Sequence, residues 1–329
     1  MTGAIRETPI ISLIIPNYNH GHLIDKCLKA IAKQTFRKFE VIIIDDYSSD
    51  SSVEIIRKEI QNDERFRLMI NEENLGVIAT LNKGFRLSKG KYLYFGAADD
   101  IILPNLLEDL YSAIIINNEI SLASMLCALN DNESSEKLKI RPLLLPTHAT
   151  KIIKPLQAAK YLRDYDNWII TGASLISRKA FIDAGTFNST LDAFSDGFLV
   201  RSIAMSQNSV FVNKFGLIWN RSTNGYSINT LVRENNQNSA FEKVKLEIKK
   251  SKVFFPVGYE ELFAKRMGFV RKINIAKMQM EPGGSRVKVF RLIFELIKLR
   301  PYKYRYIILG SIRKIWFLRE IHKLQKSLS

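Results

Sequence analysis

The chain has 329 residues, of which 46 % are hydrophobic, so it can bury a sizeable core in one large domain or two modest ones. No apolar stretch approaches the length of a membrane-spanning helix, and the polar start does not resemble a signal peptide, so we expect neither feature. Two cysteines exclude a disulfide framework and favour a reducing compartment. The four histidines do not cluster with them, which disfavours zinc.

The positive charge is concentrated at one end. The chain carries a net charge of +16, and residues 265–329 contain 17 Lys or Arg but only 3 Asp or Glu, a local net charge of +14. The remaining residues are close to neutral. We therefore expect a near-neutral globular body followed by a basic segment with a role of its own.

The first hundred residues alternate between strand-like and helix-like patterns. Apolar runs predict strands at 10–15, 41–44, 66–70 and 91–95. Helical spacing of apolar residues predicts helices at 23–34, 50–60 and 77–87. Such alternation, with continuously apolar strands, predicts an α/β fold: one Rossmann-like parallel sheet with helices on both faces.

The middle of the chain is less regular. Residues 130–150 are polar and predict a loop. Beyond them the patterns predict helices at 154–162 and 196–206 and extended segments at 168–170, 175–177 and 210–218, with a loop at 222–227. After residue 260 the chain is predicted to be helical and basic, with a break at Pro282–Gly283–Gly284.

Two pairs of adjacent acids follow predicted strands. Asp45–Asp46 comes directly after the run 41–44, and Asp99–Asp100 comes shortly after the run 91–95. The carboxyl ends of parallel strands are where open α/β sheets bind ligands, so two such pairs could hold a divalent cation and a nucleotide together. Helix capping is the alternative for both pairs.

A polar turn follows the first predicted strand. In Pro16–Asn17–Tyr18–Asn19 the tyrosine could stack on a base, and the exposed main chain could meet a ribose or pyrophosphate. An ordinary strand-to-helix turn explains the same four residues.

The order of these motifs resembles the family 2 glycosyltransferases over about residues 8–110. The resemblance is carried by Pro16–Asn19, Gln34–Phe36, Phe39–Asp46, Asn74–Gly76, Asn82–Gly84, Gly90–Tyr92, Ala98–Asp100 and Pro104. It implies the glycosyltransferase A-type fold, a nucleotide-diphosphate-sugar donor, a divalent metal (Mn²⁺ or Mg²⁺) and inversion at the sugar carbon.

The resemblance also implies roles for individual residues. Pro16, Tyr18, Asp46, Asn82 and Asp100 are the implied donor nucleotide-binding residues. Asp99 matches the metal-binding acid of the Asp-x-Asp motif of this family. The first acid of that motif falls on Ala97, which is a departure from the family pattern, and Asp100 is the acid available to compensate.

The acceptor half resembles the family through Gly172–Ser174 and Gly185–Phe187. The Phe194–Phe198 segment lies where the catalytic base is expected, which implies Asp196, with Asp192 as the second choice. A helix N-cap is the alternative role for Asp196. The segment 219–227 resembles a loop that closes over the donor, from which Asn220, Arg221 and Tyr226 would reach phosphate or acceptor.

We therefore predict a catalytic domain at 1–260, with a donor half at about 8–110 and an acceptor half at about 111–230, followed by a basic helical region at 261–329. Residues 286–300 and 302–324 combine wide apolar faces with Lys and Arg. Such helices can bind an anionic membrane surface. Packing on the body or on a second subunit is the alternative. Nothing in the sequence indicates nucleic-acid binding.

The function predicted is inverting, metal-assisted sugar transfer to a hydroxyl of a glycan or polyprenyl-linked acceptor in cell-surface polysaccharide synthesis. The expected location is the cytoplasm, peripheral at the inner face of the plasma membrane. A sugar-nucleotide nucleotidyltransferase is an alternative, but a Gly-rich basic phosphate loop should then follow the first strand, and Pro16–Asn19 is not one. A catalytically silent scaffold is the other alternative.

Overall fold

A computed structural model describes residues 8–130, 139–141, 147, 149–165, 168–220, 240–251 and 255–278. Its first half confirms the predicted alternation of strands and helices. The elements in chain order are β1 (Ile11–Asn17), α1 (Gly21–Ala32), β2 (Phe39–Asp45), α2 (Ser52–Ile60), β3 (Phe66–Ile70), α3 (Val77–Leu87) and β4 (Tyr92–Phe95). These four strands are all parallel and lie in the order β3-β2-β1-β4.

The second half extends the same sheet. Its strands are β5 (Ile101–Ile102), β6 (Ile120–Asn130), β7 (Lys139–Arg141), β8 (Lys151–Ile153), β9 (Ser174–Ser177) and β10 (Asn208–Asn220). Its helices are α4 (Leu106–Ile115), α5 (Pro155–Tyr165), η1 (Thr171–Ala173), α6 (Arg178–Asp183), η2 (Ser189–Phe194), α7 (Ser195–Ser206), α9 (Ala240–Lys250) and α10 (Tyr259–Met278).

The parallel arrangement predicted from the first hundred residues does not extend to this second half, which makes the sheet mixed. β9 lies between β4 and β6 and is antiparallel to both, while β5, β7 and β8 also pair antiparallel with their neighbours. The direction of β9 follows from its connection, because the chain enters it from η1 at the carboxyl edge and must run back. The predicted strand at 168–170 is an irregular segment leading into η1.

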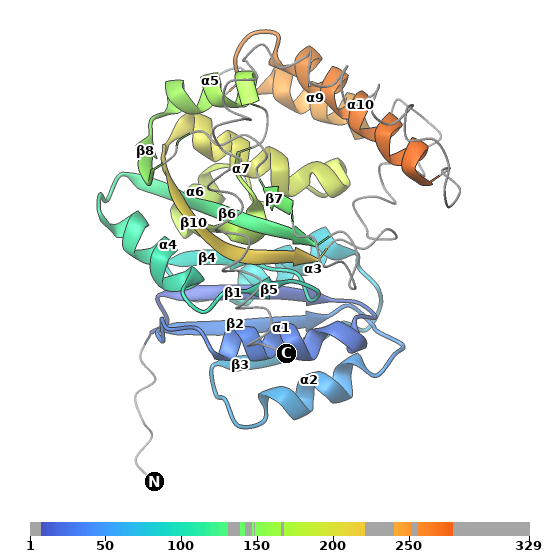
Figure 1. Cartoon of the computed structure of the whole chain (residues 1–329). Coiled ribbons are helices and arrows are strands. Elements are labelled where there is room, and N and C mark those ends of the chain that lie inside the picture. Colours follow the sequence, from blue (N-terminus) through green and yellow to red (C-terminus); the bar gives the residue numbers. More distant parts are fainter. Residues whose placement is uncertain are drawn as a thin grey trace.

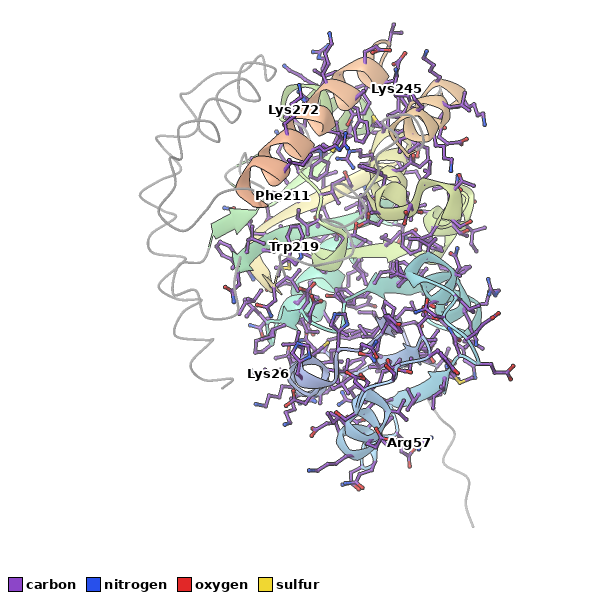
Figure 2. The ribbon with its side chains drawn as sticks, turned by 90° about the vertical axis from the view of Figure 1, so that its right-hand side faces the viewer. Lys26, Arg57, Phe211, Trp219, Lys245 and Lys272 are labelled. Carbon is purple, nitrogen blue, oxygen red and sulfur yellow. The ribbon has the colours of Figure 1, made fainter. Side chains whose placement is uncertain are left out.

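Helices cover both faces of the sheet, as predicted. Along β1, Leu13 and Ile15 join a buried cluster with α1, α2 and α4, whereas Ile14 joins a second cluster with α3, α6, α7, α9 and α10. Figure 1 shows α1 and α2 beside the first strands and α9 and α10 side by side at the opposite end of the molecule. Figure 2 shows the same separation, with Lys26 and Arg57 at one end and Lys245 and Lys272 at the other.

Helix α10 begins inside the packed body. Tyr259 and Phe263 are buried in the second cluster. Arg266 is fully buried and donates from its guanidinium to the main-chain oxygens of Leu162 (2.9 Å) and Arg163. These carbonyls belong to the last turn of α5, where a cation complements the helix dipole. The predicted border between residues 260 and 261 therefore falls within one helix.

The predicted basic helices at 286–300 and 302–324 lie outside the described residues. Within the described part of the chain, no helix combines the length and apolar character needed to cross a membrane.

Two glycines give a matched test of this packing. A methyl group added at Gly84 of α3 would lie 2.4 Å from Ile14 Cγ2, whereas one added at Gly268 of α10 has no neighbour within 4 Å. We expect Gly84→Ala to lower the free energy of unfolding by about 1–3 kcal/mol through overpacking. Gly268→Ala should raise it by about 0.5–1 kcal/mol, since alanine is the better helix former. Urea unfolding of both variants measures this, and similar values would contradict the close packing of α3.

Candidate donor and catalytic site

The carboxyl ends of β1, β2 and β4 lie at one edge of the sheet, toward the right in Figure 1. The register of β1 on β2 sets Asn17 opposite Asp45. Asp99 and Asp100 follow β4 at the same edge. The two acidic pairs are therefore brought to one edge, as their positions after strands predicted.

Asp45 holds the turns after β1 and β2 together. Its carboxylate accepts hydrogen bonds from Asn17 Nδ2 (2.7 Å), Ser48 N (2.9 Å) and Ser48 Oγ (2.6 Å). Pro16 is partly buried beside this turn. Tyr18 keeps 47 % of its surface exposed and Tyr47 keeps 60 %, so each turn presents an aromatic ring to solvent.

Asp46 is buried and binds a different loop. Its Oδ1 accepts from Asn71 Nδ2 (2.7 Å) and Leu75 N (2.9 Å), and its Oδ2 accepts from Gly76 N (2.9 Å). Gly76 has φ +81°, a conformation that favours glycine. Asp46 therefore fixes the loop that enters α3, a role that its position after a strand did not predict.

Asn82 joins the donor half to the acceptor half. From α3, its Nδ2 donates to the main-chain oxygen of Phe187 (2.8 Å), and its Oδ1 accepts from Phe187 N (3.4 Å). The next residue of α3 is Lys83, whose Nζ donates to Asn71 Oδ1 (2.6 Å), and Asn71 is the residue that also binds Asp46. Asn71 and Lys83 were not among the predicted site residues.

Asp99 and Asp100 differ in exposure. Asp99 is partly exposed, whereas Asp100 is 6 % exposed and accepts from Asn220 N (3.1 Å). Burial, and then the neighbouring Asp99 carboxylate, hold the pKa of Asp100 well above its usual range, although the Asn220 N–H acts in the opposite direction. Asn220 Nδ2 also donates to the Asp99 main-chain oxygen (2.7 Å), so this side chain positions the acidic pair. The predicted contact of Asn220 with phosphate or acceptor stays a prediction.

This pair suits a hard divalent cation. Mg²⁺ and Mn²⁺ take oxygen ligands, commonly one or two carboxylates with substrate phosphates completing the shell. The Asp99 charge and burial oppose ionisation of Asp100, and a bound cation would favour the ionised form of that carboxyl. In the part of the chain that the structure describes, no third acid, histidine or cysteine completes an all-protein metal cage. The donor set therefore fits a metal shared with a phosphorylated ligand.

The short helix η1 is close to both the metal candidate and the predicted base. Tyr94 Oη of β4 donates to the Gly172 main-chain oxygen (2.6 Å), and a methyl group added at Gly172 would lie 3.5 Å from Asp100 Oδ2. The preceding residue, Thr171, donates from its hydroxyl to the Asp196 carboxylate. Asp100 and Asp196 therefore both lie close to the same three-residue turn.

Asp196 lies in the first turn of α7 and is partly exposed. Burial raises the pKa of its carboxyl, while hydrogen bonds from Gly197 N (2.6 Å) and Thr171, and the charge of Arg201, act in the opposite direction. Asp196 does not cap α7, whose N-cap residue is Phe194 with no side-chain cap hydrogen bond. The capping alternative is therefore not supported.

Asp192, the second choice for the base, has φ +49° and ψ −131° within η2. Such a conformation is strained for a residue with a side chain, and strain of this kind gathers at functional sites. Of the other predicted acceptor-side residues, Arg221 and Tyr226 lie outside the described residues.

Comparison with known proteins shows to which family the chain belongs. A sequence model described as Glycosyl transferase family 2 matches residues 12–184, just over half of the chain. The chain belongs to glycosyl transferase family 2. The match extends well beyond the predicted donor half and includes η1 and β9.

Among curated relatives, this family 2 chain is 35 % identical over 105 residues to glycosyltransferase GlyG of Streptococcus pneumoniae, which is 32 % of this chain and 35 % of GlyG. The chain thus spans about a third of the length of that relative.

Two solved structures resemble the whole fold of this family 2 chain. TarS residues 1–349 of S. aureus, in complex with UDP-GlcNAc, has a TM-score of 0.62 at 14 % identity, over 96 % of this chain and 90 % of that one. The mannosyltransferase PcManGT of Pyrobaculum calidifontis, in complex with GDP-Man and Mn²⁺, has a TM-score of 0.50 at 16 % identity, over 94 % and 87 %. The predicted glycosyltransferase A-type α/β fold is confirmed.

Proposed function

We propose that this protein transfers a sugar, with inversion, from a nucleotide-diphosphate donor to a hydroxyl of a glycan or lipid-linked acceptor in cell-surface polysaccharide synthesis. The observation that carries the proposal is the approach of Asp100 and Asp196 to the same turn, η1, at the carboxyl edge of the sheet. The nucleotide sugars bound by TarS and PcManGT, which have the same fold, support a donor of this class.

The donor nucleotide would lie over the turns after β1 and β2. Tyr18 is exposed there and can stack on a base. Pro16 and Asp46 would line the pocket, Asp46 mainly by fixing the loop at Leu75 and Gly76. Asn82 would act by holding α3 against Phe187.

The diphosphate would lie near Asp99 and Asp100, which would hold Mn²⁺ or Mg²⁺, and the cation would supply charge stabilisation for the leaving diphosphate. Ala97 stands where the family has another acid, so Asp100 would be the second carboxylate. Asn220 and Tyr94 keep the segment around this pair in place through main-chain contacts.

Asp196 would remove the proton from the attacking acceptor hydroxyl. A general base works best when its pKa lies near the working pH, and burial moves the pKa of Asp196 in that direction. Thr171 and Gly197 donate hydrogen bonds to its carboxylate, which keeps the ionised form accessible and fixes its direction.

Thr171→Val tests this positioning role. We expect kcat to fall roughly tenfold, because a hydrogen bond to a charged group contributes about 1.5–3 kcal/mol. The Thr171 hydroxyl lowers the pKa of Asp196, so its removal should move the acid limb of the pH–rate profile to higher pH. Thr171→Ser should restore both properties. A fall in kcat with an unchanged pH profile would contradict the contact.

The acceptor and the location are proposals of the same kind. A lipid-linked acceptor at the inner face of the plasma membrane would suit the basic residues concentrated at 265–329. Cosedimentation with vesicles containing phosphatidylglycerol, compared with neutral vesicles, tests this expectation. Equal binding to both vesicle types would contradict it.

Binding of nucleotide sugars tests the function. Calorimetry with a panel of UDP-, GDP- and dTDP-sugars, once with Mn²⁺ and once with chelator, should identify one nucleotide whose binding requires metal. Absence of binding across the panel by folded protein would indicate that Ala97, in place of the first acid of the motif, abolishes metal-dependent donor binding. That result would favour a catalytically silent scaffold.

A further inference from the structure

A cavity of about 420 Å³ lies at the opposite, amino edge of the sheet. It opens between the starts of β1 and β4, the end of α4 and the start of α6, on the left-hand side of the sheet in Figure 1. The four residues of β4 separate it by about 13 Å from the loop that leads to Asp99. A ligand in this cavity would not touch the residues proposed for catalysis.

The cavity has two chemically different walls. Ile10, Tyr92, Tyr111 and Ile115 form an apolar and aromatic wall, on which the Tyr92 and Tyr111 rings meet edge to face with centroids 5.8 Å apart. Lys89, Lys91 and Arg178 form the other, basic wall, and the two walls meet where Lys91 Nζ lies over the Tyr92 ring, 5.6 Å from its centroid. We call these seven residues the amino-edge pocket. Its volume lies within the range of small-ligand sites.

Two of the three cations of the basic wall are not ion-paired among the described residues. Lys89 and Lys91 are exposed, and neither forms an ion pair with any acid in the described part of the chain. The nearby acid, Glu40, is already engaged, because its carboxylate accepts from Ser12 Oγ (2.6 Å), Lys89 N (2.6 Å) and Arg67 NH2 (2.8 Å). The Glu40 charge acts on Arg178, so an anion entering the pocket would meet Lys89 and Lys91 as the cations that no acid pairs with among the described residues.

The lysine turn is also held rigidly. Gly90 N donates to Ser12 Oγ (2.7 Å), and a methyl group at Gly90 would lie 2.6 Å from Ser12 N, so only glycine allows this approach to β1. Arg178 Nε donates to the Gly90 main-chain oxygen (2.7 Å), and its NH2 donates to Ser88 Oγ (2.7 Å). A buried carboxylate and an arginine thus fix the turn that presents two lysines, which lowers the entropic cost of binding.

We propose that the amino-edge pocket binds a phosphomonoester with an apolar or aromatic body. Lys89, Lys91 and Arg178 would hold the phosphate, since charge-assisted hydrogen bonds to phosphate are the strong ones. The body would lie on Tyr92, Tyr111 and Ile115. The ligand could be a soluble molecule or a membrane lipid with a phosphomonoester headgroup, and the chemistry of recognition is the same for both.

The test uses the full chain in excess chelator, so that metal-dependent donor binding does not contribute. Phenyl phosphate and inorganic phosphate are titrated by calorimetry into the wild type, the K89Q/K91Q variant and a matched control, K26Q/K58Q, which removes two exposed lysines from α1 and α2. The same three proteins are cosedimented with phosphatidylcholine vesicles with and without phosphatidic acid. Thermal unfolding checks that all three are folded.

We expect phenyl phosphate to bind more tightly than inorganic phosphate, and K89Q/K91Q to weaken its binding at least about tenfold while the control does not. If only the phosphatidic acid vesicles distinguish K89Q/K91Q from the control, the ligand is a lipid headgroup. If neither probe binds, or if neither probe distinguishes K89Q/K91Q from the control, the pocket is not a phosphate site and the network around Glu40 serves the fold alone.

Discussion

Asp196→Asn is expected to lower the rate of sugar transfer by about 10²- to 10⁴-fold, the usual contribution of a general base. The amide keeps the size of the carboxylate but cannot accept the acceptor proton. Donor binding should be unchanged, because Asp196 lies in the first turn of α7, whereas the proposed metal ligands follow β4. Release of nucleoside diphosphate measures the rate, and calorimetry measures donor affinity.

The pH dependence gives this prediction a second readout. Burial raises the pKa of Asp196 above its usual value of 3.8, so the wild-type rate should fall as pH drops through that raised pKa. Asp196→Asn should lack this acid limb. A variant that keeps both the limb and a near-normal rate would exclude Asp196 as the base, and Asp192→Asn would then be tested in its place.

Stability separates loss of chemistry from loss of fold. A carboxyl whose pKa is raised in the folded state stabilises the fold below its unfolded pKa, and this contribution is lost as pH rises through the folded pKa. At neutral pH the ionised carboxylate of Asp196 therefore opposes folding. We expect Asp196→Asn to unfold at an equal or higher urea concentration than the wild type. A less stable variant would indicate a structural role for Asp196.

Asp99→Ala is expected to have the second large effect, on both donor affinity and transfer rate. Without this carboxylate, donor affinity in Mn²⁺ should fall to the value seen in chelator. The transfer rate should fall at least about 10²-fold, because charge stabilisation by a metal contributes several kcal/mol. The fold should persist, since Asp99 is partly exposed in a loop. Calorimetry with and without Mn²⁺ measures the affinity.

The matched control for Asp99 is Asp109→Asn. Asp109 lies on α4 and pairs with Lys214 Nζ (2.5 Å), an exposed ion pair worth little to stability. This variant should keep metal-dependent binding and activity. If Asp99→Ala also retained metal-dependent donor binding, the metal would be held by the donor and by other groups, and the role given to this pair would be wrong.

The strands and helices of the donor half could be predicted because their signals are local. Apolar runs such as Val41–Ile44 and helical spacing such as Ile24–Ile31 specify the elements that the structure contains. The direction of β9 could not be predicted, since a short apolar strand looks the same in either direction. The strand β6 was not assigned, because an 11-residue apolar segment following closely on α4 does not distinguish a strand from a buried helix.

The position of the two acidic pairs at one edge of the sheet was predictable, but the contacts of their side chains were not. Asp45 and Asp46 were predicted to act as a pair because they are adjacent in the sequence. In the structure, Asp45 binds Asn17 and Ser48, whereas Asp46 binds the loop at Leu75 and Gly76. Thr171 reaches Asp196 across 25 residues of sequence, and no local pattern marks such a contact. The sequence pattern around Arg266 predicts a solvated cation. In the structure Arg266 is buried and contacts the end of α5.

One measurement tests the central claim most directly. The nucleotide sugar that binds in the presence of Mn²⁺ is incubated with stoichiometric protein, with water or a simple alcohol as acceptor, and the anomeric proton of the newly released sugar is followed by NMR. We predict metal-dependent cleavage to nucleoside diphosphate and a sugar product of inverted configuration. Retained configuration, or no cleavage by folded protein that binds the donor, would contradict an inverting transferase built on Asp99, Asp100 and Asp196.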